Sequence, residues 1–255
     1  MNRTTSVFIA IFFVAAPALA QESRNPTDYP VHDRERARPK VIIPPAASVD
    51  QAANPPSDAV VLFGGAGLSA WEAADGEAAP WVATNDYFQV RPGTGGIQTK
   101  EGFGDVQLHI EWSSPNPPLG EDQDRGNSGV FFMGGRYEVQ VLDSYMNDTY
   151  PDGQAAALYG QYPPLVNAMR PPGEWNEYDI VFRRPRFDGQ GDLESPATVT
   201  VFHNGVLVQD HEELTGATAN QARPAYEAHD DRMPISLQDH DHPVRFRNVW
   251  LRELE

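Results

Sequence analysis

Short runs of alternating apolar and polar residues dominate the chain from residue 58 onward, separated by Gly, Pro, Asn or Asp. A period of two is typical of half-buried strands. Tight turns are predicted at Gly134-Gly135 and Asn204-Gly205, each between two such runs. Many short strands without a helical period predict an all-β, jelly-roll sandwich of two antiparallel sheets. The predicted strands cover 59–63, 87–90, 104–112, 128–133, 137–144, 177–182, 197–203, 206–209 and 244–251.

The predicted strand at 137–144 carries polar side chains in an apolar context. Tyr137, Val139 and Val141 point to one face, and Glu138 and Gln140 point to the other. A carboxylate and an amide on one sheet face are suited to a polar ligand. We therefore expect the active site here, with two alternatives: Glu138 and Gln140 bind sugar hydroxyls, or Glu138 transfers protons.

A second polar row lies on the strand at 104–112, where His109 and Glu111 alternate with Leu108, Ile110 and Trp112. This row fits a ligand-facing surface, and it equally fits the ordinary outer face of an antiparallel sheet. Paired carboxylates on a concave sheet are the usual equipment of glycoside cleavage. We expect Glu111 and Glu138 to share such a face.

Several further side chains are candidates for metal or substrate contact. Asp143 and Tyr145 follow the strand at 137–144, and His203 lies at a strand end beside a tight turn. The segment 237–242 brings His240 close to two aspartates, and imidazole with carboxylate suits a divalent metal ion. The spacing matches no tight metal signature, so a polar loop, or Asp143 as a turn cap, explains these residues as well.

Long loops interrupt the strand pattern at 113–125 and 146–174, and loops of this length are often functional. The second loop carries Tyr150, Tyr159 and Tyr162. Tyrosine rings of this kind can cover the apolar face of a sugar, or they can simply pack the loop.

The first 57 residues differ in composition from the rest. Residues 1–20 predict a secretory signal, with Arg3, an apolar stretch at 7–16 and small residues before Gln21. The apolar stretch is too short to span a membrane, so we expect export to the periplasm or the outside, without membrane insertion. Residues 21–57 are proline-rich and predict a disordered linker that is dispensable for chemistry. Residues 58–255 form the predicted catalytic domain.

The composition narrows the class of ligand. No cysteine is present, which removes disulfides, thiolate nucleophiles and thiolate metal ligands. The formal charge is −17, and loss of Arg3 with the signal makes it −18. Such acidity disfavours nucleic acid and anionic membranes as partners. It suits a neutral sugar or a cation, and solubility outside the cell explains it equally well.

Taken in order, these segments resemble the secreted 3-keto-disaccharide hydrolase domain family, which implies a concanavalin A-like jelly roll. One departure is Asp241, where the family pattern has glycine. The resemblance covers 62–65, Trp81, 96–100, 108–112, 126–130, 137–144, 150–154, 171–175, 178–180, 203–205, 237–240 and 244–248.

The resemblance implies activity on glycosides already oxidised to a ketone at C3. Such a ketone acidifies the C2 hydrogen, so that a base removes it, the C1 substituent leaves, and water adds to the enone. This route needs a base, a group that stabilises the enolate, and an acid. A divalent metal ion would suit the second role. A non-catalytic carbohydrate-binding jelly roll and a conventional glycosidase are the alternatives.

The candidate residues therefore have three expected roles. The catalytic candidates are Glu111, Glu138 and His203. The substrate-binding candidates are Gln140, His109, Asn127, Tyr145 and Gln238. The metal-binding candidates are Asp143 and His240.

Overall fold

The computed structural model describes residues 23–46, 55–65 and 67–255. The predicted signal at 1–20 lies outside the described residues, as do 21–22 and 47–54 of the predicted linker. Among the described residues the helices are two short 3-10 turns, η1 (Pro26–Asp28) and η2 (Pro151–Gly153). No helix in these segments is long and apolar enough to cross a bilayer.

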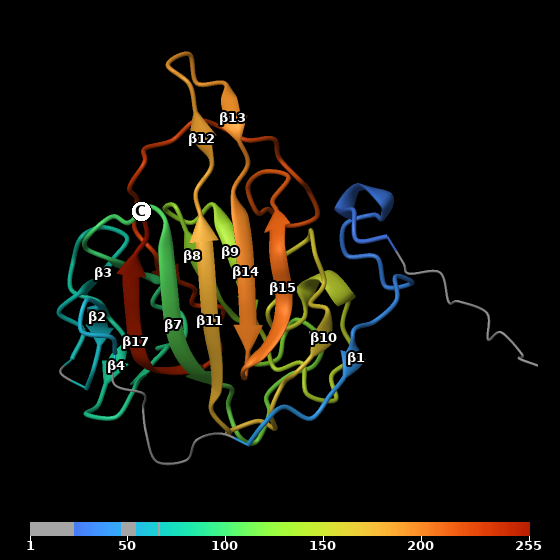
Figure 1. The fold of residues 1–255 in the computed structure, drawn as a ribbon. Coiled ribbons are helices and arrows are strands. Elements are labelled where there is room, and N and C mark those ends of the chain that lie inside the picture. The colour runs from blue at the N-terminus through green and yellow to red at the C-terminus, as the bar shows by residue number, and fades with distance from the viewer. Residues whose placement is uncertain (1–22, 47–54, 66) are drawn as a thin grey trace, which may run out of the picture.

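Two antiparallel sheets form the body of the described structure (Figure 1). The larger, eight-stranded sheet faces the viewer in Figure 1, and β8 and β9 of the smaller, five-stranded sheet lie behind it. The order in the large sheet is β15 (Val206–Glu213), β14 (Thr198–His203), β11 (Asn176–Arg183), β7 (Val106–Ser113), β17 (Arg245–Glu253), β5 (Phe88–Gln89) and β4 (Val82–Ala83), with β2 (Val60–Phe63) also paired to β17. The order in the small sheet is β3 (Trp71–Ala73), β6 (Ile97–Thr99), β16 (Ser236–Leu237), β8 (Ser128–Phe132) and β9 (Tyr137–Val141).

Two short pairings complete the described strands. β1 (Lys40–Val41) runs parallel to β10 (Val166–Asn167), and β12 (Arg186–Phe187) pairs with β13 (Leu193–Ser195). The β12–β13 hairpin extends beyond the sandwich at the top of Figure 1. The prediction of an all-β, concanavalin A-like sandwich of two antiparallel sheets is confirmed. The predicted turns at Gly134-Gly135 and Asn204-Gly205 join β8 to β9 and β14 to β15.

The core lies between the two sheets and is built from alternate residues of each strand. Ile110 and Trp112 of β7 and Val139 of β9 are all at most 1% exposed. Phe132 of the small sheet stacks on Phe182 of the large sheet, with ring centroids 4.5 Å apart. Because both sheets bury their apolar side chains in this one layer, the intervening polar side chains point to opposite outer faces of the sandwich.

The segment 23–46, which we call the arm, is packed against the domain, so the prediction of a disordered linker is wrong for this part. Arg36 is only 7% exposed, and its guanidinium donates to Gln161 O at 3.3 Å. Arg24 Nε donates to Glu212 at 2.8 Å. Although prolines leave the arm with few apolar residues, guanidinium and aromatic contacts with distant parts of the chain hold it in place.

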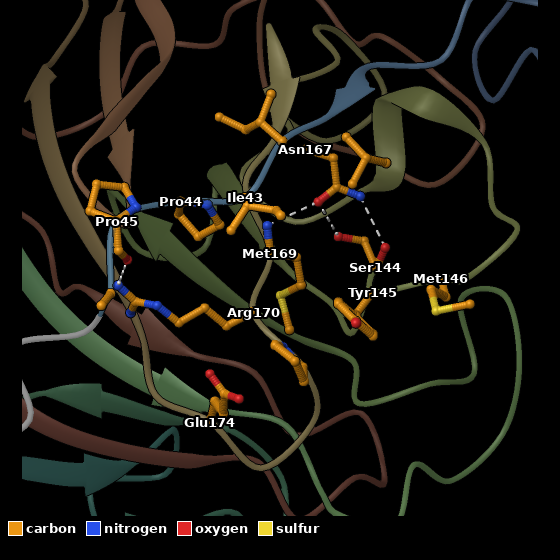
Figure 2. Close-up of a pocket in the computed structure, with 14 residues that line it drawn as sticks. Ile43, Pro44, Pro45, Ser144, Tyr145, Met146, Asn167, Met169, Arg170 and Glu174 are labelled. Carbon is orange, nitrogen blue, oxygen red and sulfur yellow. Dashed lines mark hydrogen bonds between the residues drawn. The ribbon is translucent and has the colours of Figure 1, made fainter.

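The end of the arm is fixed by backbone contacts. Ile42 N donates to Asn167 O at 3.0 Å beside the β1–β10 pairing. Figure 2 shows the guanidinium of Arg170 reaching the carbonyl of Pro45, at 3.1 Å. The blue arm therefore runs beside β10 in Figure 1.

Candidate active site

A cavity of about 430 Å³ opens on the outer face of the small sheet. Glu138 and Gln140 enter it from β9, and Phe131 enters from β8. The remaining walls come from segments before β8, after β16 and in the long loop after β9. Their side chains are Gln123, Asn127, Tyr150, Tyr159, Thr218, Ala219, Asn220, Gln238 and His240.

Glu138 is a nearly buried carboxylate, 6% exposed, at the side of this cavity. Burial raises the pKa of Glu138 to about 8, and no neighbouring charge or hydrogen bond offsets this effect. The cross-strand neighbour Gly129 makes room for it, because a Cβ there would lie 2.6 Å from Glu138 Oε1. A carboxyl with a pKa close to the working pH can both accept and return a proton.

The free edge of β9 is covered by the long loop, which brings an aromatic pair to the cavity. Ala156 N donates to Gln140 O, and Gln140 N donates to Ala157 O, both at 2.9 Å. The hydroxyls of Tyr150 and Tyr159 are 2.7 Å apart. Burial raises the pKa of both tyrosines, so both hydroxyls stay protonated. Since one hydroxyl donates to the other, one proton of the pair is left for a ligand.

The arm supports this aromatic pair from behind. The His32 ring stacks on Tyr150, with centroids 4.0 Å apart, and meets Tyr159 edge-on at 5.0 Å. His32 N donates to Asp152 Oδ2 at 3.0 Å. Sequence reasoning missed this contribution, because the contact joins segments about 120 residues apart and leaves no local pattern.

Three amide oxygens in the cavity wall are buried and find no hydrogen-bond partner within the described part of the chain: Asn127 Oδ1, Gln140 Oε1 and Gln238 Oε1. The nitrogens of two of these amides are occupied, since Gln140 Nε2 donates to Gln123 Oε1 at 3.0 Å and Asn127 Nδ2 donates to Gln123 O at 2.8 Å. Buried polar atoms of folded proteins are nearly always paired. Together with the Glu138 carboxylate, these oxygens make a wall rich in acceptors that suits a ligand with several hydroxyl donors.

His240 reaches the cavity from a turn held by Asp239. The Asp239 carboxylate accepts from the backbone nitrogens of Thr94 and Gly95 at 2.9 Å and of Asp241 at 3.0 Å. Asp241, the departure from the family pattern, has a φ of 62°. Glycine adopts this left-handed conformation freely, and aspartate is among the few other residues that tolerate it. The turn is therefore compatible with either residue.

The prediction that Glu111 and Glu138 share one face is wrong. Glu111 lies on the outer face of the large sheet, where it accepts from Arg247 Nε at 2.6 Å and Asn248 Nδ2 at 2.9 Å. Burial alone would raise the pKa of Glu111, but the His109 imidazole, whose Nε2 lies 3.8 Å from Oε1, and hydrogen bonds with Asn248 and Arg247 lower it to about 2. Each carboxylate does point away from the core, as its strand's alternation predicts, but the two strands belong to different sheets.

His109 lies with Glu111 on the outer face of the large sheet. It does not line the cavity that contains Glu138, so the prediction that it binds substrate there is wrong. Its Nδ1 donates to Asp179 Oδ1 at 2.8 Å, and its ring stacks on Trp250 with centroids 5.1 Å apart. Burial lowers the pKa of His109, but the hydrogen bond to Asp179 and the Glu111 carboxylate 3.8 Å from Nε2 outweigh it and raise the pKa to about 9. The cluster is a charge network on the sheet surface, and no cavity that contains Glu138 includes it.

His203 is a core residue, contrary to the prediction of a catalytic group. It is 1% exposed, its Nε2 donates to Asn176 Oδ1 at 3.1 Å, and it stacks on Trp112. Burial lowers the pKa of His203 to about 3, so the ring is neutral. His203 alternates with more exposed residues in step with the buried Val199 and Val201 of β14, so it points to the core. The sequence already contained this alternation.

Asp143 and Tyr145 also lie outside the cavity. Asp143 is fully buried, and its carboxylate accepts from Arg125 Nε at 2.9 Å and Tyr145 N at 3.1 Å. Tyr145 lines a different cavity of about 670 Å³, formed where the arm passes the loops at 144–146 and 167–174 (Figure 2). The predicted metal pair of Asp143 and His240 is therefore split. The described residues offer no group of three His, Cys, Asp or Glu arranged to hold a metal ion.

Of the sequence-predicted site residues, the structure brings together Glu138, Gln140, Asn127, Gln238 and His240. Gln123, Phe131 and Thr218 are cavity residues that were missed. Phe131 could have been found, because counting back across the Gly134-Gly135 turn pairs it with Glu138. Thr218 could not, since it comes from a loop that carries no strand pattern; its hydroxyl accepts from Glu138 N at 3.1 Å.

Known proteins resemble this chain in sequence and in fold. A protein from Bacteroides thetaiotaomicron described as a 3-keto-disaccharide hydrolase is 24% identical over 243 residues, which cover 77% of this chain and 78% of that protein. A crystal structure from Parabacteroides distasonis, of a protein proposed to be a glycosyl hydrolase, superposes with a TM-score of 0.74 at 49% identity and covers 78% of this chain and 84% of that one.

A second Parabacteroides distasonis structure shares the fold, with a TM-score of 0.57 at 18% identity over 78% of this chain and 94% of that one. Residues 58–252 match the family described as the 3-keto-alpha-glucoside-1,2-lyase-like domain. The matched range contains both sheets and every cavity side chain described above. The chain belongs to this family.

Proposed function

We propose that the protein cleaves 3-keto-glycosides by removing the C2 proton, eliminating the C1 substituent and hydrating the product. The observation that carries the proposal is Glu138, a buried carboxylate that receives no cation or donor from the described residues, in a cavity whose walls are rich in hydrogen-bond acceptors. The family match and the relatives' descriptions support a carbohydrate-acting hydrolase of this class.

In the first half of the reaction Glu138 takes the proton from C2, and the C–H electrons move into an enolate whose oxygen is the former C3 ketone. The enolate then re-forms the ketone, a C1–C2 double bond forms, and the C1–O bond breaks. The leaving oxygen takes a proton and departs as an alcohol. The acceptor-rich wall would hold the sugar hydroxyls while this happens.

In the second half, water adds its oxygen to C1 and a proton returns to C2, which gives net hydrolysis. Glu138 is protonated after the first half, exchanges its proton with solvent while the alcohol departs, and then supplies a solvent-derived proton to C2. The free proton of the Tyr150–Tyr159 pair, the Thr218 hydroxyl and His240 are the donors available to the ketone oxygen or the leaving oxygen. The described residues do not form a three-ligand metal site, and every step above uses protein side chains and water.

The decisive experiment incubates the purified protein with a 3-keto-glucoside in heavy water, with and without chelator. We expect release of the aglycone and deuterium at C2 of the sugar, detected by mass spectrometry and NMR. Binding without turnover would instead identify a carbohydrate-binding module. Cleavage of the unoxidised glycoside at a similar rate would identify a conventional glycosidase. Loss of turnover with chelator, restored by a divalent ion, would add a metal to the mechanism.

We also propose that the protein is exported, on the basis of the signal-like pattern of residues 1–20. N-terminal sequencing of the protein recovered from the producing cells and their medium tests this directly. A mature N-terminus at Gln21 is expected. A retained Met1 would contradict the proposal.

A further inference from the structure

One row of side chains crosses the outer face of the small sheet from edge to edge. The strand registers pair Glu138 with Phe131, Phe131 with Ser236, and Ser236 with Gln98. The row ends at Glu72 on β3, which is paired with Gln98. In each strand the core-facing neighbours are buried apolar or hydroxyl residues, so these five side chains share the outer face. Adjacent strands lie about 4.8 Å apart, so Ser236 is on the order of 10 Å from Glu138.

A second cavity, of about 270 Å³, lies over the part of this row that is farther from Glu138. Gln98 and Ser236 line it, and Phe131 and Gln238 line both this cavity and the one that contains Glu138. The two cavities are therefore neighbours on one sheet face, with the Phe131 ring and the Gln238 side chain between them.

The wall of the second cavity has the chemistry of a sugar subsite. Its polar groups include the Ser236 hydroxyl and the Gln98 amide, whose Nε2 donates to Glu72 Oε1 at 3.2 Å and which is thereby oriented. The buried oxygen of Gln238, which has no partner, lies at the boundary between the two cavities. Phe131 offers an aromatic surface for the apolar face of a pyranose ring. Gly96, Gly134 and Gly135 also line the cavity, and at Gly135 an added Cβ would point into open space.

We propose that this second cavity is the leaving-group subsite, and that it binds the second sugar ring of a 3-keto-disaccharide. The proposal rests on the proposed function, since it places the oxidised ring beside Glu138. Two linked rings extend over about two strand spacings, on the order of 10 Å, which matches the distance from Glu138 to Ser236. The substrate class is thus a disaccharide or a glycoside with a hydroxylated aglycone, rather than a simple alkyl glycoside.

The test compares two substrates that differ only in the leaving group, a 3-keto-disaccharide and methyl 3-keto-glucoside. In the double variant Gln98→Ala/Ser236→Ala, kcat/KM should fall about tenfold for the disaccharide, as expected for one or two lost hydrogen bonds. It should change less than twofold for the methyl glycoside. The variant Ser236→Phe, which fills the cavity, should show a larger fall with the same selectivity.

The matched control is Gln107→Ala, the same substitution on the outer face of the large sheet, which should leave both substrates unaffected. Equal falls in kcat/KM for both substrates, or no change for either, would overturn the subsite.

If the wild type turns over neither substrate, the proposed function fails and the subsite is tested by NMR titration with the unoxidised sugars. The wild type should then bind the disaccharide more tightly than the methyl glucoside, and the double variant should not. Equal affinities in the wild type would overturn the proposal.

Discussion

The two outer faces of the sandwich carry carboxylates that are buried to the same extent and behave in opposite ways. Glu111 on the large sheet is 7% exposed, and Glu138 on the small sheet is 6% exposed. The pKa of Glu111 is lowered to about 2, whereas that of Glu138 is raised to about 8. The difference lies in partners: Glu111 has Arg247, Asn248 and His109 around it, and burial alone acts on Glu138.

Burial therefore does not by itself distinguish a reactive carboxylate from a structural one. On the large sheet, the Arg247 guanidinium stacks 4.2 Å from the centre of the Trp175 ring, which fixes the ion pair with Glu111. A carboxylate held in this way stays ionised and has no capacity to take a proton near neutral pH. We expect Glu111 to stabilise the large sheet and Glu138 to perform the chemistry.

The strongest test of this contrast is turnover. Glu138→Gln keeps the size of the side chain and removes the base, so turnover of a 3-keto-glycoside should fall by roughly two to four orders of magnitude. Glu111→Gln is the matched control and should stay within a few-fold of the wild type. Steady-state kinetics on both variants, with circular dichroism to confirm folding, provides the measurement. A folded Glu138→Gln protein with near-normal turnover would refute the assignment.

The next largest effect is on the pH profile. Glu138 must be ionised to act as a base, so kcat/KM should rise about tenfold per pH unit between pH 6 and 8 and level off near the pKa of about 8. Glu111 is already ionised throughout this range and contributes no inflection. Kinetics from pH 5.5 to 9.5 in a constant-ionic-strength buffer would show this. An activity that is flat from pH 6 to 9 would argue against Glu138 as the base.

Stability should depend on pH with opposite signs at the two sites. The raised pKa of Glu138 means that the folded state binds more protons than the unfolded state between about pH 4.5 and 8, so its contribution becomes more unfavourable as the pH rises through that window. The lowered pKa of Glu111 gives a stabilisation that is present above about pH 4.5 and is lost as the pH falls towards 2.

At pH 8 we therefore expect Glu111→Gln to lower the free energy of unfolding by roughly 1–3 kcal/mol, because it breaks hydrogen bonds to charged partners. Glu138→Gln should leave that free energy unchanged or raise it. Denaturant titrations of both variants at pH 5 and pH 8 measure the difference. Equal destabilisation by the two substitutions at pH 8 would remove the distinction between the faces.

The smallest predicted effect concerns the arm, which reaches the small-sheet site through His32. The stack of His32 on Tyr150 is worth roughly 0.5–1.5 kcal/mol, so His32→Ala should lower kcat/KM by a few-fold. His32→Phe keeps an aromatic ring and should restore most of the loss. Arg38→Ala, which removes an exposed ion pair of the arm with Asp148, is the control and should have no effect. Equal kinetics for His32→Ala and Arg38→Ala would show that the arm does not position the tyrosines.

The sequence predicted to which face of its strand each side chain points. It did not predict which strands pair in the same sheet. Alternation placed Glu138 and Gln140 away from the core, and the structure agrees. It could not assign β7 and β9 to different sheets, because that choice depends on long-range pairing, and so Glu111 was placed on the wrong face. The same limit applies to the arm, whose partners, such as Glu212, lie far along the chain. A low apolar content is a measure of local composition and carries no information about such partners.

The position of the arm also sets an order of assembly. Its contacts include Asp152, Pro163, Asn167, Gln209 and Glu212, each of which follows its partner in the arm by more than a hundred residues. A chain made from its N-terminus therefore cannot complete the contacts of the arm with Gln209 and Glu212 until β15 has been synthesised, and closing so long a loop is slow. Tyr150 and Tyr159 acquire the backing of His32 only when the arm docks, so the wall of the Glu138 cavity is completed by two segments that lie far apart in the chain.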